Sequence, residues 1–449
     1  MVELRSERRV ETEEIPSASG ARVDTSRGRT LERLEAPAPP VFPSPRIREF
    51  RNPAKNNRQL YHLNHLGVFC RELSVSSPSP SSAGTSARSG ARLQAFCAKP
   101  ASQPASQQTM GGLPVVTLAT GGSCMPVIGM GTVSYPPAAP DATRAAILRA
   151  IGLGYRHFDT AAIYGTEQPL GEAIAEALRQ GLVGSREDLF VTTKLWCNDA
   201  HPGLVVPALT NSLRNLGLDY VDLYLVHLPV SAKPGKLEVQ IKDEDFMTFD
   251  MASVWEGMEQ CHRLGLAKSV GVSNFSCKKL ALLLETASIP PSVNQVEMNP
   301  LWQQQKLREF CAAKGIHVNA YFPLGGSRTP FCPNNLVMEN TILKEIAEAT
   351  GKTIAQKRFT YIVACVDMCL ICVVWGLEVC LRWAYEQGVS MLVKSFNEKR
   401  MEENLSLFDW ELNEEDRHKI SQIPQHKSLT LSEFCGQYKS LTELWDGEI

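Results

Sequence analysis

Short apolar runs that alternate with longer amphipathic stretches constrain the fold of this chain more than any other feature. From residue 126 onward, eight such runs carry mainly Val, Ile, Leu, Met or Phe. They read "PVIGMG", "YRHFDTA", "DLFVTTKLW", "YVDLYLVHLP", "AKSVGVSNF", "SVNQVEMNP", "IHVNAYFPL" and "SMLVKSF". Runs that are apolar on both faces are typical of parallel strands covered by helices.

The stretches between these runs have helical periodicity. In "ATRAAILRAIGLG", "LGEAIAEALRQGL" and "LVVPALTNSLRNLGL", apolar residues recur at three- and four-residue spacing. Eight strand–helix units predict an α/β fold, the closed (β/α)8 TIM barrel, which takes about 250 residues plus insertions. The alternative is a doubly wound open sheet. No G-x-G-x-x-G turn follows the first strand, which weighs against that alternative.

The composition changes near Met110. Residues 1–109 contain runs such as "SVSSPSPSSAGTSARSGAR", which have little apolar periodicity and predict a disordered N-terminal extension. Residues 110–449 are the predicted barrel. A plastid transit peptide would be Ser- and Arg-rich, but the acidic residues of "MVELRSERRVETEEIP" weigh against one. We interpret the extension as an upstream addition without a role, and expect a cytoplasmic protein translated from Met110.

One apolar segment, "KRFTYIVACVDMCLICVVWGLE" at 357–378, is about as long as a bilayer crossing, roughly 20 residues. Asp367 near its middle is costly in lipid, and a crossing would separate the seventh strand from the eighth. Without this segment, "GKTIAQ" continues into "VCLRWAYEQGVSMLVKSF" as one helix and strand. We interpret it as a retained or wrongly chosen coding segment; the alternatives are a natural insertion and a membrane span.

Charge and cysteine content exclude several partner classes. A formal net charge of -2 gives no indication of nucleic-acid binding. The thirteen cysteines have no regular disulfide spacing, which favours a reduced compartment. Cys365, Cys369 and Cys372 lack a second ligand pair, so no metal is predicted. We expect a monomer that acts on a small molecule, without a membrane partner.

Polar residues stand at the ends of the predicted strands, where the active sites of such barrels lie. Asp159 ends the second strand and Tyr164 follows it, Lys194 ends the third, and His227 ends the fourth. The later strands end in Ser273, Asn274, Gln295, Tyr321, Lys394 and Ser395. Each residue alone has an ordinary explanation, such as a helix cap, a solvated lysine or a core histidine. Their shared position at one rim indicates a site.

Together, four of these residues make a proton-donating arrangement. A Tyr hydroxyl with a pKa near 10 is a poor acid at neutral pH. A neighbouring Lys ammonium is expected to lower that pKa, and an Asp holds the ammonium in place. A His within reach orients a carbonyl oxygen. The arrangement suits protonation of an alkoxide while hydride arrives at carbon.

Longer motifs make the interpretation specific. "GYRHFDTAAIYGTEQPLGEAI", "GVSNF" and "KSFNEKRMEEN" resemble the aldo-keto reductase superfamily over nearly all of 115–449 apart from 357–378. "FVTTKLW" and "NQVEMNPLWQQ" resemble its plant members, such as deoxymugineic acid synthases and chalcone (polyketide) reductases. The resemblance implies NADPH-dependent reduction of an aldehyde or ketone by a tetrad with Tyr164 as the acid. Its members are Asp159, Tyr164, Lys194 and His227.

The resemblance also implies the cofactor residues. Ser273, Asn274 and Gln295 would hold the nicotinamide carboxamide, and Tyr321 would stack on the ring. Lys394, Ser395 and Arg400 would contact the 2′-phosphate, because two cations and a hydroxyl suit a phosphate dianion better than a bare ribose. The remaining implied cofactor contacts are Thr132, Asp159, Leu324, Phe396, Asn397, Glu403 and Asn404.

The substrate pocket implied by the resemblance includes Trp196, His227 and Leu228, together with the tail after Pro424. The chain departs from the family pattern at two positions. Leu228 stands where Trp is frequent, which changes the pocket wall, and Phe322 stands where Ser is common, near the expected pyrophosphate path. A further alternative keeps every site residue in a barrel that the 357–378 segment prevents from closing, which would be an inactive reductase-like protein.

Overall fold

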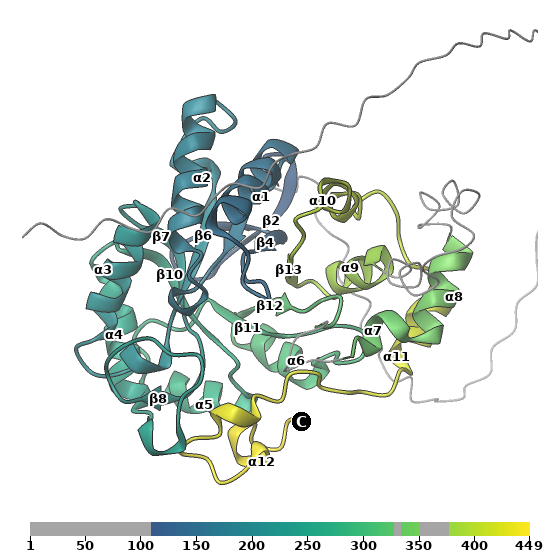
Figure 1. Ribbon diagram of the computed structural model, residues 1–449. Coiled ribbons are helices and arrows are strands. Elements are labelled where there is room, and N and C mark those ends of the chain that lie inside the picture. Colours follow the sequence, from purple (N-terminus) through teal and green to yellow (C-terminus); the bar gives the residue numbers. More distant parts are fainter. Residues whose placement is uncertain (1–108, 327–333, 351–376) are drawn as a thin grey trace, which may run out of the picture. The chain divides into compact units, whose positions relative to one another are not determined.

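The computed structural model describes residues 109–326, 334–350 and 377–449 (Figure 1). Eight parallel strands form a closed barrel, in which the first strand pairs with the last. They are β4 (Ile128–Gly131), β5 (His157–Asp159), β6 (Phe190–Leu195), β7 (Val221–Val226), β10 (Ala267–Ser273), β11 (Val293–Glu297), β12 (His317–Tyr321) and β13 (Ser390–Val393). Each lies within one of the eight apolar runs, so the predicted (β/α)8 barrel is confirmed.

Helices follow the strands and cover the outside of the barrel (Figure 1). They are α1 (Pro140–Leu153), α2 (Glu167–Gln180), α3 (Val205–Leu216), α4 (Met251–Arg263), α5 (Cys277–Thr286), α6 (Gln305–Ala313), α7 (Leu336–Glu339), α8 (Thr341–Thr350) and α9 (Leu377–Glu386). Helix α1 illustrates how the sequence sets the ends of a helix. Pro140 suits its first turn, and Gly154 ends it in a left-handed conformation at φ 107°. Its buried residues, including Ile147 and Ile151, recur at three- and four-residue spacing against the strands.

A small antiparallel sheet precedes the barrel and was not predicted. It consists of β1 (Thr109–Met110), β2 (Leu113–Thr117) and β3 (Cys124–Pro126). Leu118 and Met125 form one buried cluster with Phe190, Leu223 and Val293, which lie at or near the amino-terminal ends of their barrel strands. The sheet therefore covers the end of the barrel opposite the predicted site.

Strand β13 completes the barrel on both sides. Its Ser390 pairs with Asn319 of β12. Three successive residues, beginning with Met391, pair with three successive residues of β4, beginning with Ile128. The Ser390 amide also donates a hydrogen bond to Nε2 of His317 at 3.1 Å. The described chain thus closes the barrel, although α8 and α9 flank the range 351–376. Residues 357–376 of the apolar segment and residues 1–108 of the predicted extension lie outside the described residues.

The chain after β13 packs beside the barrel mouth. It forms α10 (Glu398–Leu405), α11 (Glu414–Ser421) and α12 (Leu441–Leu444), the last two shown in yellow tones (Figure 1). Asp446 accepts hydrogen bonds from Lys279 Nζ and Ser276 Oγ, both at 2.6 Å, which ties the tail to α5. A two-stranded hairpin, β8 (Ser231–Ala232) and β9 (Phe246–Met247), lies in the connection between β7 and α4. Within the described ranges no helix is long and apolar enough to cross a bilayer.

Candidate active site

Three adjacent strands bring the predicted tetrad together. Asp159 is the last residue of β5, Lys194 lies near the end of β6, and His227 directly follows β7. The Lys194 ammonium is 2.5 Å from Oδ1 of Asp159 and 2.9 Å from the Thr160 carbonyl oxygen. Because Lys194 is only 1% exposed, this ion pair is held in a site without bulk water. A charge-assisted bond in such a setting fixes the ammonium rigidly.

The Tyr164 hydroxyl faces the same place from the short helical turn after β5. It lies 3.2 Å from Nε2 of His227, and the Lys194 ammonium is 4.9 Å from the centre of the Tyr164 ring. The Tyr164 and His227 rings meet edge to face, with centroids 5.4 Å apart. The four side chains are therefore linked by successive contacts, from Asp159 through Lys194 and Tyr164 to His227. Their catalytic roles remain a prediction.

Burial sets the protonation of the histidine. Desolvation, reinforced by the Lys194 ammonium, lowers the pKa of His227 well below its ordinary 6.5. The imidazole is consequently neutral at physiological pH. Within the described chain, Nδ1 of His227 is buried and has no hydrogen-bond partner. A neutral imidazole can accept from a hydroxyl or donate to a carbonyl oxygen, depending on its tautomer.

The pKa values of the Tyr164 hydroxyl and the Lys194 ammonium are both raised. Desolvation raises the pKa of Tyr164, and although Lys194 acts to lower it, burial outweighs the ammonium. Burial alone would lower the pKa of Lys194, but Asp159 and Tyr164 together raise it. The lowering of the Tyr164 pKa by Lys194 that the sequence predicted is present, but desolvation of the hydroxyl exceeds it. The Tyr164 hydroxyl is therefore protonated at neutral pH.

Polar side chains from the neighbouring strands continue the site as one hydrogen-bonded network. Gln295 Nε2 donates to Oδ2 of Asp159 at 2.9 Å, and Ser273 Oγ donates to the Gln295 carbonyl at 2.8 Å. Asn274 Nδ2 donates to the His227 carbonyl at 3.0 Å, and Asn274 Oδ1 accepts from the Tyr321 hydroxyl at 2.7 Å. Asn274 has φ 64°, a left-handed conformation that Asn tolerates better than most residues.

Other predicted residues border this network. The Thr132 hydroxyl donates to the Asp159 carbonyl at 3.0 Å, beneath the tetrad. Leu324 is half-buried and packs on the main core. Phe322 is also half-buried, its ring lies edge-on to Tyr321 at 5.2 Å, and its φ of 51° is unusual for an aromatic residue. The residue thus lies beside a predicted cofactor contact.

The segment from β13 into α10 gathers cations at a helix start. Lys394 and Arg400 are exposed, and the Lys394 ammonium lies 4.3 Å from the centre of the Phe396 ring. Partial burial and the Arg400 charge lower the pKa of Lys394, which shows that the two cations act on each other. Asn397 caps α10 by accepting from the Arg400 amide at 3.1 Å. Two cations beside a helix amino terminus form an anion-binding arrangement.

Three further residues of this segment have local partners. Ser395 Oγ accepts from the Asn397 amide at 3.1 Å. Glu403 pairs with Lys399 at 3.8 Å, and Asn404 is buried.

The predicted pocket residues meet the tail. Trp196 and Leu228 belong to one buried cluster with Leu431, Phe434 and Trp445. The Trp196 ring meets those of His227 and Phe434 edge to face, with centroids 5.0 and 5.6 Å apart. The tail and Trp196 therefore form an apolar wall directly beside the tetrad.

Glu297 is a site-bordering residue that the sequence reasoning missed. Its fully buried carboxylate accepts from the amides of Ser428 and Leu429, at 3.0 and 2.8 Å, and so fixes the start of the tail. The signal was present, since an acid inside the apolar run 292–300 needs a partner. Metal-ligand clusters of three or more acidic, His or Cys side chains do not occur in 109–326, 334–350 and 377–449.

Comparisons with known proteins identify the family. The model of the Aldo/keto reductase family matches residues 127–425, so the chain belongs to the aldo/keto reductase family. The resemblance stated from the sequence motifs is thereby confirmed, and with it the assignment to the oxidoreductases.

Named relatives and a solved structure refine the picture. A deoxymugineic acid synthase 1 of Hordeum vulgare is 56% identical over 328 residues, 72% of this chain and 97% of that protein. A (1S)-1,7-diacetoxy-luvungin A aldo-keto reductase of Citrus sinensis is 53% identical over 72% of this chain and 95% of its own. The crystal structure of a Bombyx mori aldo-keto reductase in complex with NADP has a TM-score of 0.61 and 35% identity, and covers 73% of this chain and 98% of its own.

Proposed function

We propose that this protein reduces the carbonyl group of an aldehyde or ketone to an alcohol with NADPH. The observation that carries the proposal is the set of contacts that joins Asp159, Lys194, Tyr164 and His227, with exposed Lys394 and Arg400 in the segment from β13 into α10. NADPH supplies the hydride when bound. The solved silkworm relative, which is in complex with NADP, supports this cofactor.

In the proposed reaction, the Tyr164 hydroxyl donates the proton. The substrate oxygen lies where the Tyr164 hydroxyl and neutral His227 both reach it, so developing negative charge is stabilised there. Lys194, held by Asp159, stabilises the phenolate left behind. Because burial raises the pKa of Tyr164, proton transfer follows charge development on the substrate and does not precede it.

The network above the tetrad is proposed to orient the nicotinamide. Ser273, Asn274 and Gln295 would hold its carboxamide, and Tyr321 would stack on the ring. Lys394, Ser395 and Arg400 would bind the 2′-phosphate. The arrangement supports this assignment because the cations stand at a capped helix start, where a dianion is favoured.

The finer proposal concerns the substrate. We propose reduction of 3″-deamino-3″-oxonicotianamine to 2′-deoxymugineic acid, a step of phytosiderophore biosynthesis. The 56% identity to the barley relative supports it. The 53% identity to the citrus reductase is nearly as high, so overall similarity leaves a polyketide-type or general carbonyl reductase as the alternative. Leu228 in the pocket wall is one residue on which the difference depends.

The experiment is a titration of the purified full chain with NADPH, with Trp fluorescence as the signal and NADH as the control, followed by turnover of a carbonyl substrate. NADPH-selective quenching and NADPH oxidation are the expected results. A matched protein without residues 357–378 tests the inactive alternative. Binding by the shorter protein alone would assign the function to that form, and no binding by either would overturn the proposal.

A further inference from the structure

Lys427, at the start of the tail, is a buried cation that the proposed reaction does not use. It is 8% exposed, and its ammonium lies 3.4 Å from the centre of the Trp445 ring and 5.3 Å from that of the Trp302 ring. Among the described residues, no hydrogen bond or ion pair reaches this ammonium. The electron-rich faces of the two indoles therefore take the place of water and of a countercharge.

The two rings belong to segments that are far apart in the sequence. Trp302 lies in the loop after β11, and Trp445 directly follows α12. The residue before Lys427 is bonded to the same loop, since the His426 amide donates to the Leu301 carbonyl at 2.6 Å. Lys427 thus joins the loop after β11 to the far end of the tail.

Trp445 extends this contact to the apolar wall beside the tetrad. It is 4% exposed, and its indole N–H donates to the Thr430 carbonyl at 2.9 Å. It shares one buried cluster with Trp196 and Phe434, whose rings meet edge to face at 5.6 Å. The Trp196 ring in turn meets that of His227 at 5.0 Å. One packed cluster therefore separates the Lys427 contact from the tetrad.

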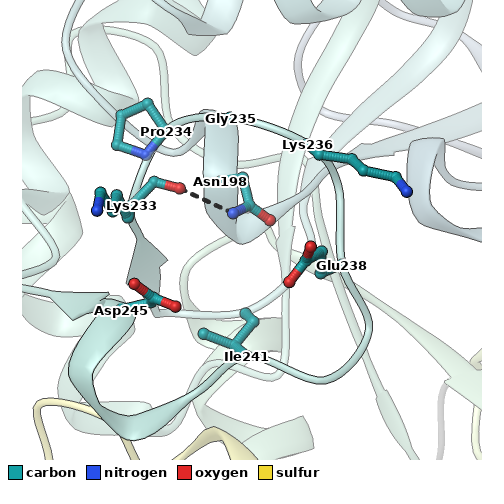
Figure 2. A pocket seen from close by; sticks show the side chains of 8 residues that line it. All are labelled: Asn198, Lys233, Pro234, Gly235, Lys236, Glu238, Ile241 and Asp245. Carbon is teal, nitrogen blue, oxygen red and sulfur yellow. Dashed lines mark hydrogen bonds between the residues drawn. The ribbon is translucent and has the colours of Figure 1, made fainter.

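The other side of Trp196 is held without a cation. Its indole N–H donates to the Glu238 carbonyl at 2.9 Å, in the connection between β8 and β9 (Figure 2). That connection is fixed in turn by the bond from Asn198 Nδ2 to the Lys233 carbonyl at 2.8 Å, drawn in the same figure. Neutral hydrogen bonds thus hold one side of the wall, whereas the tail side rests on the charge of Lys427.

That charge is sensitive to pH just above neutrality. Desolvation lowers the pKa of Lys427 to about 8, although the charges of Glu297 and Glu448 act to raise it. These carboxylates have other partners, since Glu297 accepts from tail amides and Glu448 lies 4.0 Å from Lys306 of α6. Half of the Lys427 side chains are therefore neutral near pH 8, and a neutral amine has no cation–π attraction to the rings.

We propose that Lys427 is a positioning residue for bulky carbonyl substrates, because its ammonium, held between Trp302 and Trp445, fixes the tail side of the pocket wall. A substrate that extends away from its carbonyl group packs on this wall, whereas a small one reaches only the tetrad. Loss of the ammonium proton frees the tail side and weakens the contact with the bulky substrate alone. The inference rests on the proposed carbonyl reduction and adds a determinant of substrate size to that site.

The test compares a bulky aldehyde, 4-(benzyloxy)benzaldehyde, with a small one, propanal, in the full chain at saturating NADPH. The measured quantity is the ratio of the bulky to the small kcat/KM value between pH 7 and pH 9. Both reactions share the tetrad and the cofactor, so titration of those groups cancels in the ratio. We expect the wild-type ratio to fall by about threefold to tenfold, the effect of one desolvated cation–π contact, with a midpoint near pH 8.

Two variants separate the charge from the shape of the side chain. Lys427→Arg remains charged at pH 9 and should keep the high ratio throughout the range. Lys427→Met has no charge, and its ratio should be low and independent of pH. The matched control is Lys439→Met, which removes an exposed cation from the same tail and should behave as the wild type.

A wild-type ratio that does not change with pH would overturn the proposal. So would a fall in Lys427→Arg equal to that of the wild type, or a Lys427→Met ratio that follows the wild-type curve. If Lys427→Arg does not fold, the presence or loss of pH dependence in Lys427→Met decides the question. Turnover of neither aldehyde would instead contradict the proposed carbonyl reduction itself.

Discussion

Two charged regions at one end of the barrel differ in the burial and the pairing of their charged side chains. In the tetrad, the Lys194 ammonium is 1% exposed and bonded to Asp159 and the Thr160 carbonyl. At the start of α10, Lys394 and Arg400 are exposed, and partial desolvation together with the Arg400 charge lowers the pKa of Lys394. The first region has its countercharge built into the fold, whereas in the second the described residues show two neighbouring cations and no acidic side chain paired with either.

This difference indicates two different roles for the charged side chains. A buried, fully bonded ion pair fixes geometry at a reacting centre, where preorganised charge lowers a barrier. Neighbouring exposed cations raise the energy of the empty site and are relieved when an anion binds. We therefore expect substitutions in the tetrad to change turnover, and substitutions at α10 to change cofactor affinity. The following predictions test that division, from the largest effect to the smallest.

The sharpest test is Tyr164→Phe, which removes only the hydroxyl. We expect kcat to fall by about 10²–10⁴-fold, the usual contribution of a general acid, while the Kd for NADPH changes little. Steady-state NADPH oxidation and Trp fluorescence titration measure the two quantities. Loss of NADPH binding in this variant would break the comparison, because it would make Tyr164 part of the cofactor region.

The converse test is Lys394→Ala. Loss of one of two cations facing a dianion should raise the Kd for NADPH about tenfold to a hundredfold and leave that for NADH nearly unchanged. Lys399→Ala, in the adjoining helix α10 and already paired with Glu403, is the control and should have little effect. Equal weakening of NADPH and NADH by Lys394→Ala would contradict the 2′-phosphate assignment.

The lowered pKa values of two histidines extend the comparison to the effect of pH on stability. Burial lowers the pKa values of His157 and His317 to about 4, from an ordinary 6.5. Between these values the unfolded chain binds protons that the folded chain does not. Stability is therefore complete above pH 6.5 and falls as pH drops towards 4, by up to about 1.4 kcal/mol per pH unit for each histidine.

Urea unfolding at several pH values measures this slope. His317→Gln should make it shallower, although the lost bond from the Ser390 amide also lowers stability at neutral pH. The exposed His418→Gln serves as the control and should leave the slope unchanged. A slope that does not change in the His317 variant would show that other groups dominate the acid response.

The smallest expected effect comes from an exposed ion pair between α1 and α10. Arg149 and Glu398 are 3.2 Å apart, and their side chains are 44% and 58% exposed. Arg149→Ala should change the free energy of unfolding by less than about 1 kcal/mol, and moderate salt should remove the difference. A much larger loss of unfolding free energy would show that charges near this helix stabilise the fold. The difference between this region and the tetrad would then be smaller than we propose.

The sequence predicted the barrel well because its physical signal is repeated. Eight runs that are apolar on both faces alternate with helical stretches, and each run contains a strand of the closed barrel. The tetrad was also predictable, since barrel geometry brings consecutive strand ends such as Asp159, Lys194 and His227 to one rim. The sheet formed by β1, β2 and β3 was not, because strands of two to five residues leave too short a pattern.

Effects that depend on several distant segments escaped the sequence reasoning. The raised Tyr164 pKa follows from how much of the chain surrounds the hydroxyl, which a list of nearby charges does not give. Among the described residues, Oδ1 of Asn198 has no hydrogen-bond partner, whereas its Nδ2 donates to the carbonyl of Lys233, 35 residues later. The φ of 51° at Phe322 likewise could not be predicted, because an aromatic residue gives no indication of a left-handed backbone.

The pairing of β13 with both β4 and β12 has a consequence for biosynthesis. A ribosome makes the chain from its amino terminus, so two strand edges wait unpaired until residues 390–393 emerge. The cations of α10 follow within the next few residues. A transcript that stops before this point would yield an open, aggregation-prone sheet without the proposed phosphate site. Completion of the fold and acquisition of the cofactor thus coincide near the end of synthesis.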